Sequence, residues 1–182
     1  MQKLIDSLHR YKRQFPNESG PIGKVLAWIE KYWNFAFVKD NLEGHLTGSM
    51  IIMNPESTKV LLMLHKKFQR WQQFGGHCDG QVDVRNVAIR EFHEESGIEL
   101  SPIINWDIFH VHVHDVPLDS KGRPAHQHFD ILYLGTIPED TPFSRQESEV
   151  DDIRWFDIDE VLLYNDERLM YKCIQKIKNL WK

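Results

Sequence analysis

The sequence of 182 residues is 41% hydrophobic and 27% charged, and it has a formal net charge of −5. This length and composition predict one globular domain with a hydrophobic core, and no run approaches the roughly 20 apolar residues that a membrane-spanning helix needs. The acidic balance excludes the basic surface with which proteins bind nucleic acids or anionic membranes, so a polyanionic substrate needs a local device such as a metal ion.

The first 40 residues predict two helices that extend the domain. Leu4, Leu8 and Tyr11 recur at helical spacing in the first of them. A second helix is expected over residues 21–33 with Pro21 at its start, where a helical N–H has no partner in any case. An aromatic group near the end of this helix covers the core or forms a dimer surface, and it comprises Trp28, Tyr32, Trp33, Phe35 and Phe37.

From Gly44 onward the sequence is typical of strands mixed with helices. Strands and helices in this order predict a single α/β sandwich, with a helical extension over residues 1–40 and the main domain over residues 41–182. A glycine-marked loop is expected over residues 74–81. Strands are expected over residues 45–54, 59–66, 106–115, 125–135 and 151–158, and a last helix carries Leu169, Cys173, Ile177 and Leu180 on one stripe.

One further helix is expected to begin after an N-cap at Asp83 and to end at Gly97. Aspartate is a preferred N-cap, and glycine just past the last turn is the usual left-handed terminator. At about 100° per residue, Val84, Val87 and Ala88 define the face that a buried helix turns inward.

Three carboxylates continue this inward face. Glu91 and Glu95 fall within about 20° of its centre, and Glu94 lies beside them. Two carboxylates about 6 Å apart repel by roughly 3 kcal/mol at an effective dielectric constant near 20, so a cation or bound protons must offset their charge. Oxygen ligands in a half-open site favour Mg²⁺ or Mn²⁺ over zinc, and Arg90 is placed to pair with a neighbouring carboxylate.

The stretch "GGHCDGQVDVRNVAIREFHEESGI", residues 75–98, resembles the Nudix box in the spacing of its glycines, its Arg-Glu pair and its Glu-Glu pair. The sequence departs from the box at Val82, which stands where the family has its first glutamate, and at Gln81, which replaces a frequent glycine. This departure bears on the loop before the helix more than on metal binding. The matching positions are Gly76, Arg90, Glu91, Phe92, Glu94, Glu95, Gly97 and Ile98.

The resemblance covers residues 44–182 and implies the Nudix fold, an α/β/α sandwich with a mixed central sheet. It also implies a metal-dependent hydrolase that cleaves a diphosphate bond in a nucleotide-linked or similar small molecule, with Mg²⁺ or Mn²⁺ as cofactor. The implied metal ligands are Glu91, Glu94 and Glu95, together with the backbone carbonyl of Gly75. Arg90, Glu91 and Glu94 are the catalytic residues that it implies.

A further carboxylate is expected in the acidic loop "SRQESEVDDIRWF". Nudix enzymes often add a glutamate from a loop ahead of a late strand, as a metal ligand or as the base for the attacking water. Glu149 is the choice because its distance ahead of Trp155 resembles the family spacing. Glu147 and Glu91 remain competing candidates for the base.

Five histidines fall in two expected strands: His110, His112 and His114, then His126 and His128. Side chains alternate along a strand, so each set shares one face, and the sets meet if the two strands pair. This face is a substrate-lining wall, a polar outer surface or a zinc site. His126 and His128, with His77 beside the glycine pair, are the predicted substrate-binding residues.

Two other functions stay open. One is an isopentenyl-diphosphate isomerase-like enzyme of the same fold, and the other is a non-catalytic Nudix module that senses a ligand. The sequence does not name the diphosphate substrate, and a homodimer is possible. Two cysteines, Cys78 and Cys173, lie far apart without metal-finger spacing, which predicts a reducing, cytoplasmic location without a disulfide between them.

Overall fold

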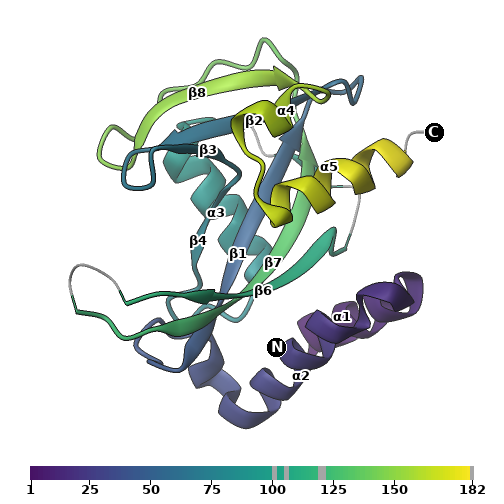
Figure 1. Ribbon diagram of the computed structural model, residues 1–182, viewed down its shortest axis with the longest axis vertical. Coiled ribbons are helices and arrows are strands. Elements are labelled where there is room, and N and C mark those ends of the chain that lie inside the picture. Colours follow the sequence, from purple (N-terminus) through teal and green to yellow (C-terminus); the bar gives the residue numbers. More distant parts are fainter. Residues whose placement is uncertain (100–101, 105–106, 119–121, 181–182) are drawn as a thin grey trace. The chain divides into compact units, whose positions relative to one another are not determined.

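The computed structural model describes residues 1–99, 102–104, 107–118 and 122–180 (Figure 1). By its contacts the chain divides into two units. The first comprises residues 1–49, 75–88 and 106–133, and the second comprises residues 50–74, 89–105 and 134–182. Each unit is described by itself.

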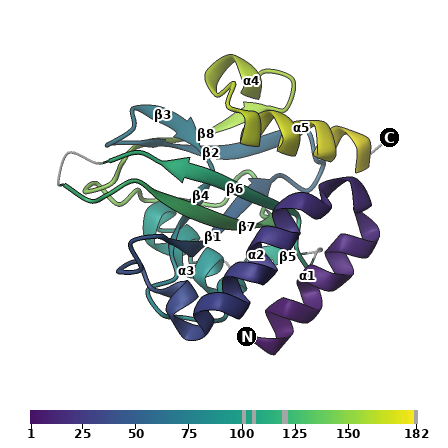
Figure 2. The ribbon, with the colours of Figure 1, turned by 60° about the horizontal axis from the view of Figure 1, so that its bottom comes forward.

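Two helices begin the first unit, α1 (Gln2–Gln14) and α2 (Ser19–Tyr32), and they lie side by side (Figure 2). Short 3-10 helices follow each of them, η1 (Pro16–Glu18) and η2 (Trp33–Phe37). Tyr11 donates a hydrogen bond to the carbonyl oxygen of Phe109 at 3.2 Å, and the Trp28 ring stacks on Phe129 at 4.6 Å. The N-terminal helices are therefore packed on the sheet of this unit.

The strands of the first unit are the beginning of β1 (Gly44–Met53), most of β4 (Phe74–His77), β6 (His110–Val116) and most of β7 (His126–Thr136). β6 and β7 pair in antiparallel register. This register sets His114 opposite His128 and His112 opposite Asp130, so the two sets of histidines meet as the sequence predicts.

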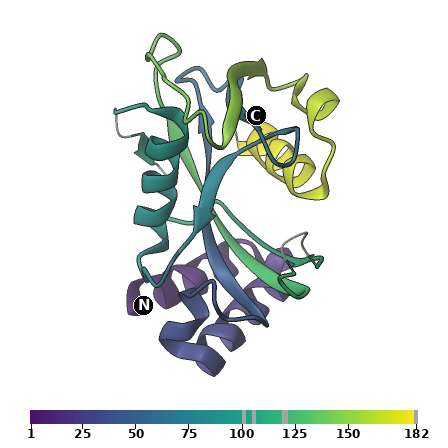
Figure 3. The ribbon, with the colours of Figure 1, turned by 90° about the vertical axis from the view of Figure 1, so that its left-hand side faces the viewer.

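The second unit contains a hairpin of β2 (Lys59–His65) and β3 (Arg70–Gln72), with β8 (Val150–Asp157) on the other edge of β2. β5 (Ile103–Ile104) pairs with the end of β7. Two helices complete this unit, α4 (Val161–Tyr164) and α5 (Arg168–Leu180), drawn in yellow in Figure 3. Asn165, between these helices, donates to the carbonyl oxygen of Trp71 at 2.8 Å and ties them to β3.

One helix, α3 (Val84–Ser96), begins and ends as predicted. The Asp83 carboxylate accepts a hydrogen bond from the backbone N–H of Asn86 at 3.2 Å, which is the N-cap interaction. At the other end Gly97 has φ of 63°, the left-handed conformation that glycine adopts without steric cost.

The described strands form an eight-stranded sheet. Its main order is β3-β2-β1-β7-β5, while β4 pairs with β1, β6 with β7 and β8 with β2. The fold is therefore of the predicted α/β class, with the predicted N-terminal helices. In the part of the chain that the structure describes, no helix is both long and apolar enough to cross a membrane.

The sequence missed three short strands, β3, β4 and β5. β4 lies inside the expected glycine loop, because glycines give no strand pattern even where their backbone pairs. Pro21 is also not at the start of α2, which begins two residues earlier at Ser19. The proline still falls in the first turn, where its missing N–H leaves no helical hydrogen bond unmade. The predicted strand over residues 106–115 begins at a residue outside the described ranges, and β6 itself starts at His110.

Candidate active site

The carboxylates of α3 lie where the helical wheel places them. The Glu91 side chain is 13% exposed, Glu95 is 2% exposed as a residue, and Val87 and Ala88 on the same face are fully buried. The Glu94 side chain is 50% exposed, in keeping with a position beside this face. Glu91 and Glu95 are thus turned toward the protein, while Glu94 at their side is half exposed.

Arg90 holds two of these carboxylates. One guanidinium nitrogen lies 2.9 Å from Glu91 Oε1, and another donates to Glu94 Oε2 at 3.1 Å. Burial raises the pKa of the Glu91 carboxyl, Arg90 opposes this shift, and the charges of Glu94 and Glu149 add to it. The site therefore holds more negative charge than its arginine offsets.

The predicted acidic loop docks on the end of α3. The backbone N–H of Ser144 donates to the carbonyl oxygen of Ser96 at 2.9 Å, and that of Gln146 donates to the carbonyl oxygen of Glu95 at 3.2 Å. A Cβ at Gly97 would collide with the Ser144 backbone, so this approach requires glycine. Together these contacts bring the segment that carries Glu149 to the acidic helix.

Glu149 and Glu147 differ in their relation to Glu91. Both side chains are exposed in the turn before β8. The Glu149 charge raises the pKa of Glu91, and its backbone carbonyl accepts a hydrogen bond from the N–H of Lys66 at 2.8 Å. Glu147 is placed by a different contact, since its backbone carbonyl accepts a hydrogen bond from the Lys66 ammonium at 2.7 Å.

A hard divalent cation fits this group of residues. Its donors are carboxylate oxygens, the ligands that Mg²⁺ and Mn²⁺ prefer, and Glu91 is buried with a raised pKa that a nearby positive charge would lower again. Glu94 and Glu149 are exposed enough to reach a substrate that carries such an ion. The role of Glu91, Glu94, Glu95 and Glu149 as ligands of such an ion stays a prediction.

Gly75 belongs to the first unit and has φ of 150°. A Cβ there would collide with Ser49 and would lie 2.7 Å from the carbonyl oxygen of Gly48. The glycine is required by this close approach to β1. Its predicted role as a carbonyl ligand of the metal stays a prediction.

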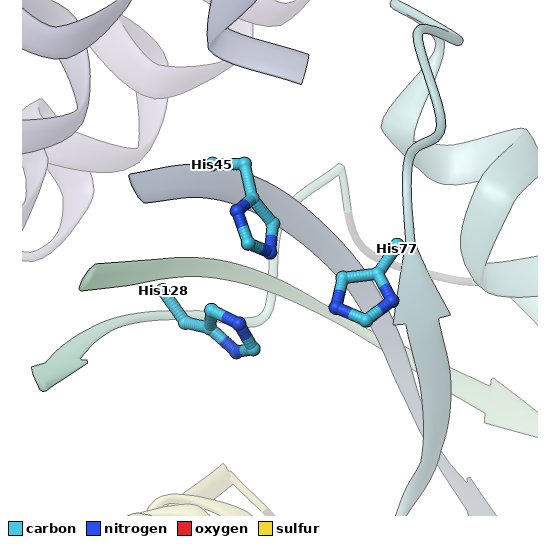
Figure 4. A group of neighbouring side chains, drawn as sticks. All are labelled: His45, His77 and His128. Carbon is cyan, nitrogen blue, oxygen red and sulfur yellow. The ribbon is translucent and has the colours of Figure 1, made fainter. Parts of the chain in front are cut away.

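The first unit also brings together imidazoles from three strands. His45 of β1 lies 5.0 Å from His77 of β4 and 4.6 Å from His128 of β7 between ring centroids, and the three rings point toward one another (Figure 4). His126 packs against His45 at 5.2 Å and His128 at 5.1 Å. We call His45, His77, His126 and His128 the histidine cluster.

Burial keeps the imidazoles of His45, His77 and His128 neutral. Desolvation, followed by the neighbouring imidazoles, lowers the pKa of His45 to about 2. Desolvation likewise lowers the pKa of His128 to about 3, although the Asp130 carboxylate opposes the shift, and it lowers the pKa of His77. At neutral pH each of these rings therefore offers a lone pair and no positive charge.

The remaining strand histidines have other partners. His114 Nδ1 lies 3.0 Å from the buried Asp130 carboxylate, which also accepts a hydrogen bond from Thr47. His110 is 2% exposed, and its Nδ1 lies 2.9 Å from Glu18 Oε2. The sequence gives no sign that His45 belongs to this cluster, because only the pairing of strands far apart in the chain brings it to His77 and His128.

Comparison with known proteins gives matches of two kinds. The family model for the NUDIX domain matches residues 44–177. A relative in Lactococcus lactis subsp. cremoris, named "Probable DHNTP pyrophosphohydrolase", is 27% identical over 119 residues. That alignment covers 65% of this chain and 66% of the relative, just under two thirds of its length.

Solved structures share the fold. An Ap4A hydrolase of C. elegans in a binary complex has a TM-score of 0.60 at 18% identity, covering 75% of this chain and 96% of that one. The E. coli dihydroneopterin triphosphate pyrophosphohydrolase has a TM-score of 0.58 at 15% identity, covering 74% of this chain and 92% of that one. These matches confirm the predicted fold class.

The family model spans most of the chain and includes both α3 and the loop that carries Glu149. The motif read from residues 75–98 therefore lies inside the segment that matches the family. This chain belongs to the NUDIX domain family.

Proposed function

We propose that this protein is a pyrophosphohydrolase that cleaves a diphosphate bond in a nucleotide-linked or similar small molecule and depends on Mg²⁺ or Mn²⁺. The observation that carries the proposal is the burial of Glu91 and Glu95 on the inward face of α3, beside Glu94 and within the field of Glu149. A divalent cation there supplies positive charge that offsets the charge of the diphosphate as the bond breaks.

The residues of the chain perform the remaining tasks. Arg90 orients Glu91 and Glu94 through its two ion pairs. The Glu149 carboxylate, from its exposed turn, takes the proton of the water that attacks phosphorus, and Glu91 is the competing base. His77, His126 and His128 are proposed substrate contacts of the first unit, either directly or through a bound ion.

The compounds to test first come from the names of similar proteins. Dihydroneopterin triphosphate and Ap4A are named in two of the solved structures above. ADP-ribose, which is bound in a solved structure of the NUDIX domain of Shewanella oneidensis NrtR, extends the panel to a sugar-linked diphosphate. We further propose residues 1–40 as a helical extension and residues 41–182 as the catalytic domain, a cytoplasmic location and a homodimeric state to be measured by light scattering. The intact Arg90-Glu91 and Glu94-Glu95 pairs of α3 favour hydrolysis over the isomerase-like and sensing alternatives.

The test uses this panel with Mg²⁺ and the variants Glu94→Gln and Glu95→Gln. Each variant should lose most of the activity while keeping the wild-type circular dichroism spectrum. Glu30→Gln, which changes an exposed helical glutamate of α2, is the matched control and should be fully active. Normal turnover by either α3 variant, on a substrate that the wild type cleaves, would contradict the metal site.

A further inference from the structure

The histidine cluster contains a buried nitrogen without a hydrogen-bond partner. His45 is fully buried, and its Nε2 has no hydrogen-bond partner within the described ranges. Its other nitrogen, Nδ1, has only a long contact of 3.5 Å with the Arg123 guanidinium. A buried polar group without a partner costs roughly 1–3 kcal/mol, so a fold that retains one needs a reason to do so.

The hydrogen bonds of His126 fix how its ring is protonated. Its Nδ1 lies 2.8 Å from the carbonyl oxygen of Pro124, which only accepts, so Nδ1 carries the proton and Nε2 carries a lone pair. That lone pair faces His128 Nε2 at 3.2 Å. His128 Nε2 therefore donates to it, and a histidine whose one ring nitrogen donates in this way is oriented to bind a metal ion through the other.

The separations of the nitrogens match a shared ion after a small adjustment. One ring nitrogen from each of His45, His77 and His128 lies within 4.8 Å of the other two. Two nitrogens about 2.0–2.1 Å from one tetrahedral zinc ion are roughly 3.3 Å apart. His77 and His128 are only partly buried and can rotate inward over the remaining distance.

We propose that His45, His77 and His128 bind a divalent transition-metal ion of the zinc class, with His126 as a positioning residue that orients His128. Neutral imidazoles are ligands that zinc accepts readily and that Mg²⁺ avoids, so this site differs in kind from the carboxylates of α3. The proposal goes beyond the proposed function, which assigns the metal ion of hydrolysis only to the carboxylates.

Binding through Nε2 of His45 requires the ring proton on Nδ1, so the long contact with Arg123 is given up. Arg123 keeps its hydrogen bond to the carbonyl oxygen of Lys39. The charges around the cluster are mixed: Arg123 and Lys39 disfavour a cation, while Asp79 near His77 and Asp130 near His128 favour one. Three neutral ligands leave a fourth position on the ion for water or a substrate oxygen.

The experiment is calorimetric titration of the chelator-treated full-length protein with Zn²⁺, alone and in the presence of millimolar Mg²⁺. One equivalent should bind, Mg²⁺ should not displace it, and Co²⁺ in its place should give the visible absorption of a tetrahedral site. His77→Gln and His128→Gln should each weaken binding by at least about 100-fold, and His126→Gln by about 10-fold to 100-fold. His45→Gln should do the same as His77→Gln, provided that its circular dichroism spectrum matches the wild type.

Two controls separate this site from others. His9→Gln removes an exposed histidine of α1 and should leave Zn²⁺ binding unchanged. Glu94→Gln should also leave it unchanged, even where it abolishes hydrolysis. The proposal is overturned if no stoichiometric Zn²⁺ binding occurs, or if folded His77→Gln and His128→Gln bind Zn²⁺ as the wild type does.

Discussion

The carboxylates of α3 and the histidine cluster are both groups of titratable side chains drawn into the protein, but they differ in how the chain assembles them. Glu91, Glu94 and Glu95 lie on one helix, where 3.6 residues per turn fixes their neighbours. The histidines come from three strands and meet only through sheet pairing. A site that lies on one helix can therefore be predicted from the spacing of its residues in the sequence. A site that forms only when distant strands pair cannot be predicted in this way.

Burial also shifts the pKa values of the two groups in opposite directions. Arg90 pairs with Glu91 and Glu94, and burial raises the pKa of Glu91, so a bound proton or a cation would offset the charge of that carboxylate. Burial lowers the pKa values of His45 and His128, which leaves neutral rings that are stable without an ion. The predictions below test this contrast, from the largest expected effect to the smallest.

The largest effect is expected from Glu149→Gln. Removal of a general base typically lowers the rate about 10²–10⁴-fold while substrate binding is largely kept. We expect kcat to fall by this factor with little change in KM, measured on a substrate from the panel. Glu147→Gln is the control and should do much less. Equal effects of the two variants, or an effect of Glu147→Gln alone, would move the base away from Glu149.

Acid should destabilise the metal-free protein through the histidine cluster. A lowered imidazole pKa means that the unfolded chain binds protons that the folded chain refuses, so the free energy of unfolding falls as pH drops below 6.5. The fully buried His45 alone should lower the free energy of unfolding by up to about 1.4 kcal/mol for each pH unit below 6.5, until the pH reaches its folded pKa of about 2.

Urea denaturation at pH 7.0 and 5.5 measures this slope. His45→Gln should reduce the dependence of the free energy of unfolding on pH, even though the loss of a well-packed ring lowers stability at both pH values. The exposed His9→Gln should leave the dependence unchanged. A slope that is the same with and without His45 would show that the ring is protonated in the folded protein.

His126→Ala should raise KM by about tenfold, because it removes the ring that orients His128, and a hydrogen bond from His128 to a charged substrate group contributes about 1.5–3 kcal/mol. The dependence of the rate on Mg²⁺ concentration should not change, because His126 lies in the first unit and is not one of the proposed Mg²⁺ ligands. A shift in the Mg²⁺ requirement would instead join His126 to the metal chemistry, as an isomerase-like enzyme requires.

The smallest effect is on thermal stability. Mg²⁺ at ten times its dissociation constant stabilises the folded state by about 1.4 kcal/mol, which for a chain of this size raises Tm by about 2–6 °C. Glu94→Gln and Glu95→Gln should abolish this shift in scanning calorimetry. An unchanged wild-type Tm would show that the carboxylates do not form a site in the absence of substrate.

The sequence predicts α3 and its acidic face almost residue by residue, because the N-cap at Asp83, the glycine at its end and the apolar stripe are all local signals. It also predicts the strands whose side chains alternate and the meeting of His114 with His128. It misses β4, because glycines have no side chains to show a pattern, and it misses His45 because no local rule pairs β1 with strands that follow many residues later.

The close approach of Gly97 to Ser144 limits where the chain can accept insertions. Any insertion or deletion between Gly97 and Ser144 must leave Ser144 and Gln146 within reach of the carbonyl oxygens of Ser96 and Glu95 at the end of α3. Insertions nearer to Glu149, between Gln146 and β8, would break the hydrogen bonds that tie the acidic turn to Gln146 and to Lys66. Variants and grafts of this loop should therefore keep residues 144–150 at constant length and place added sequence before them.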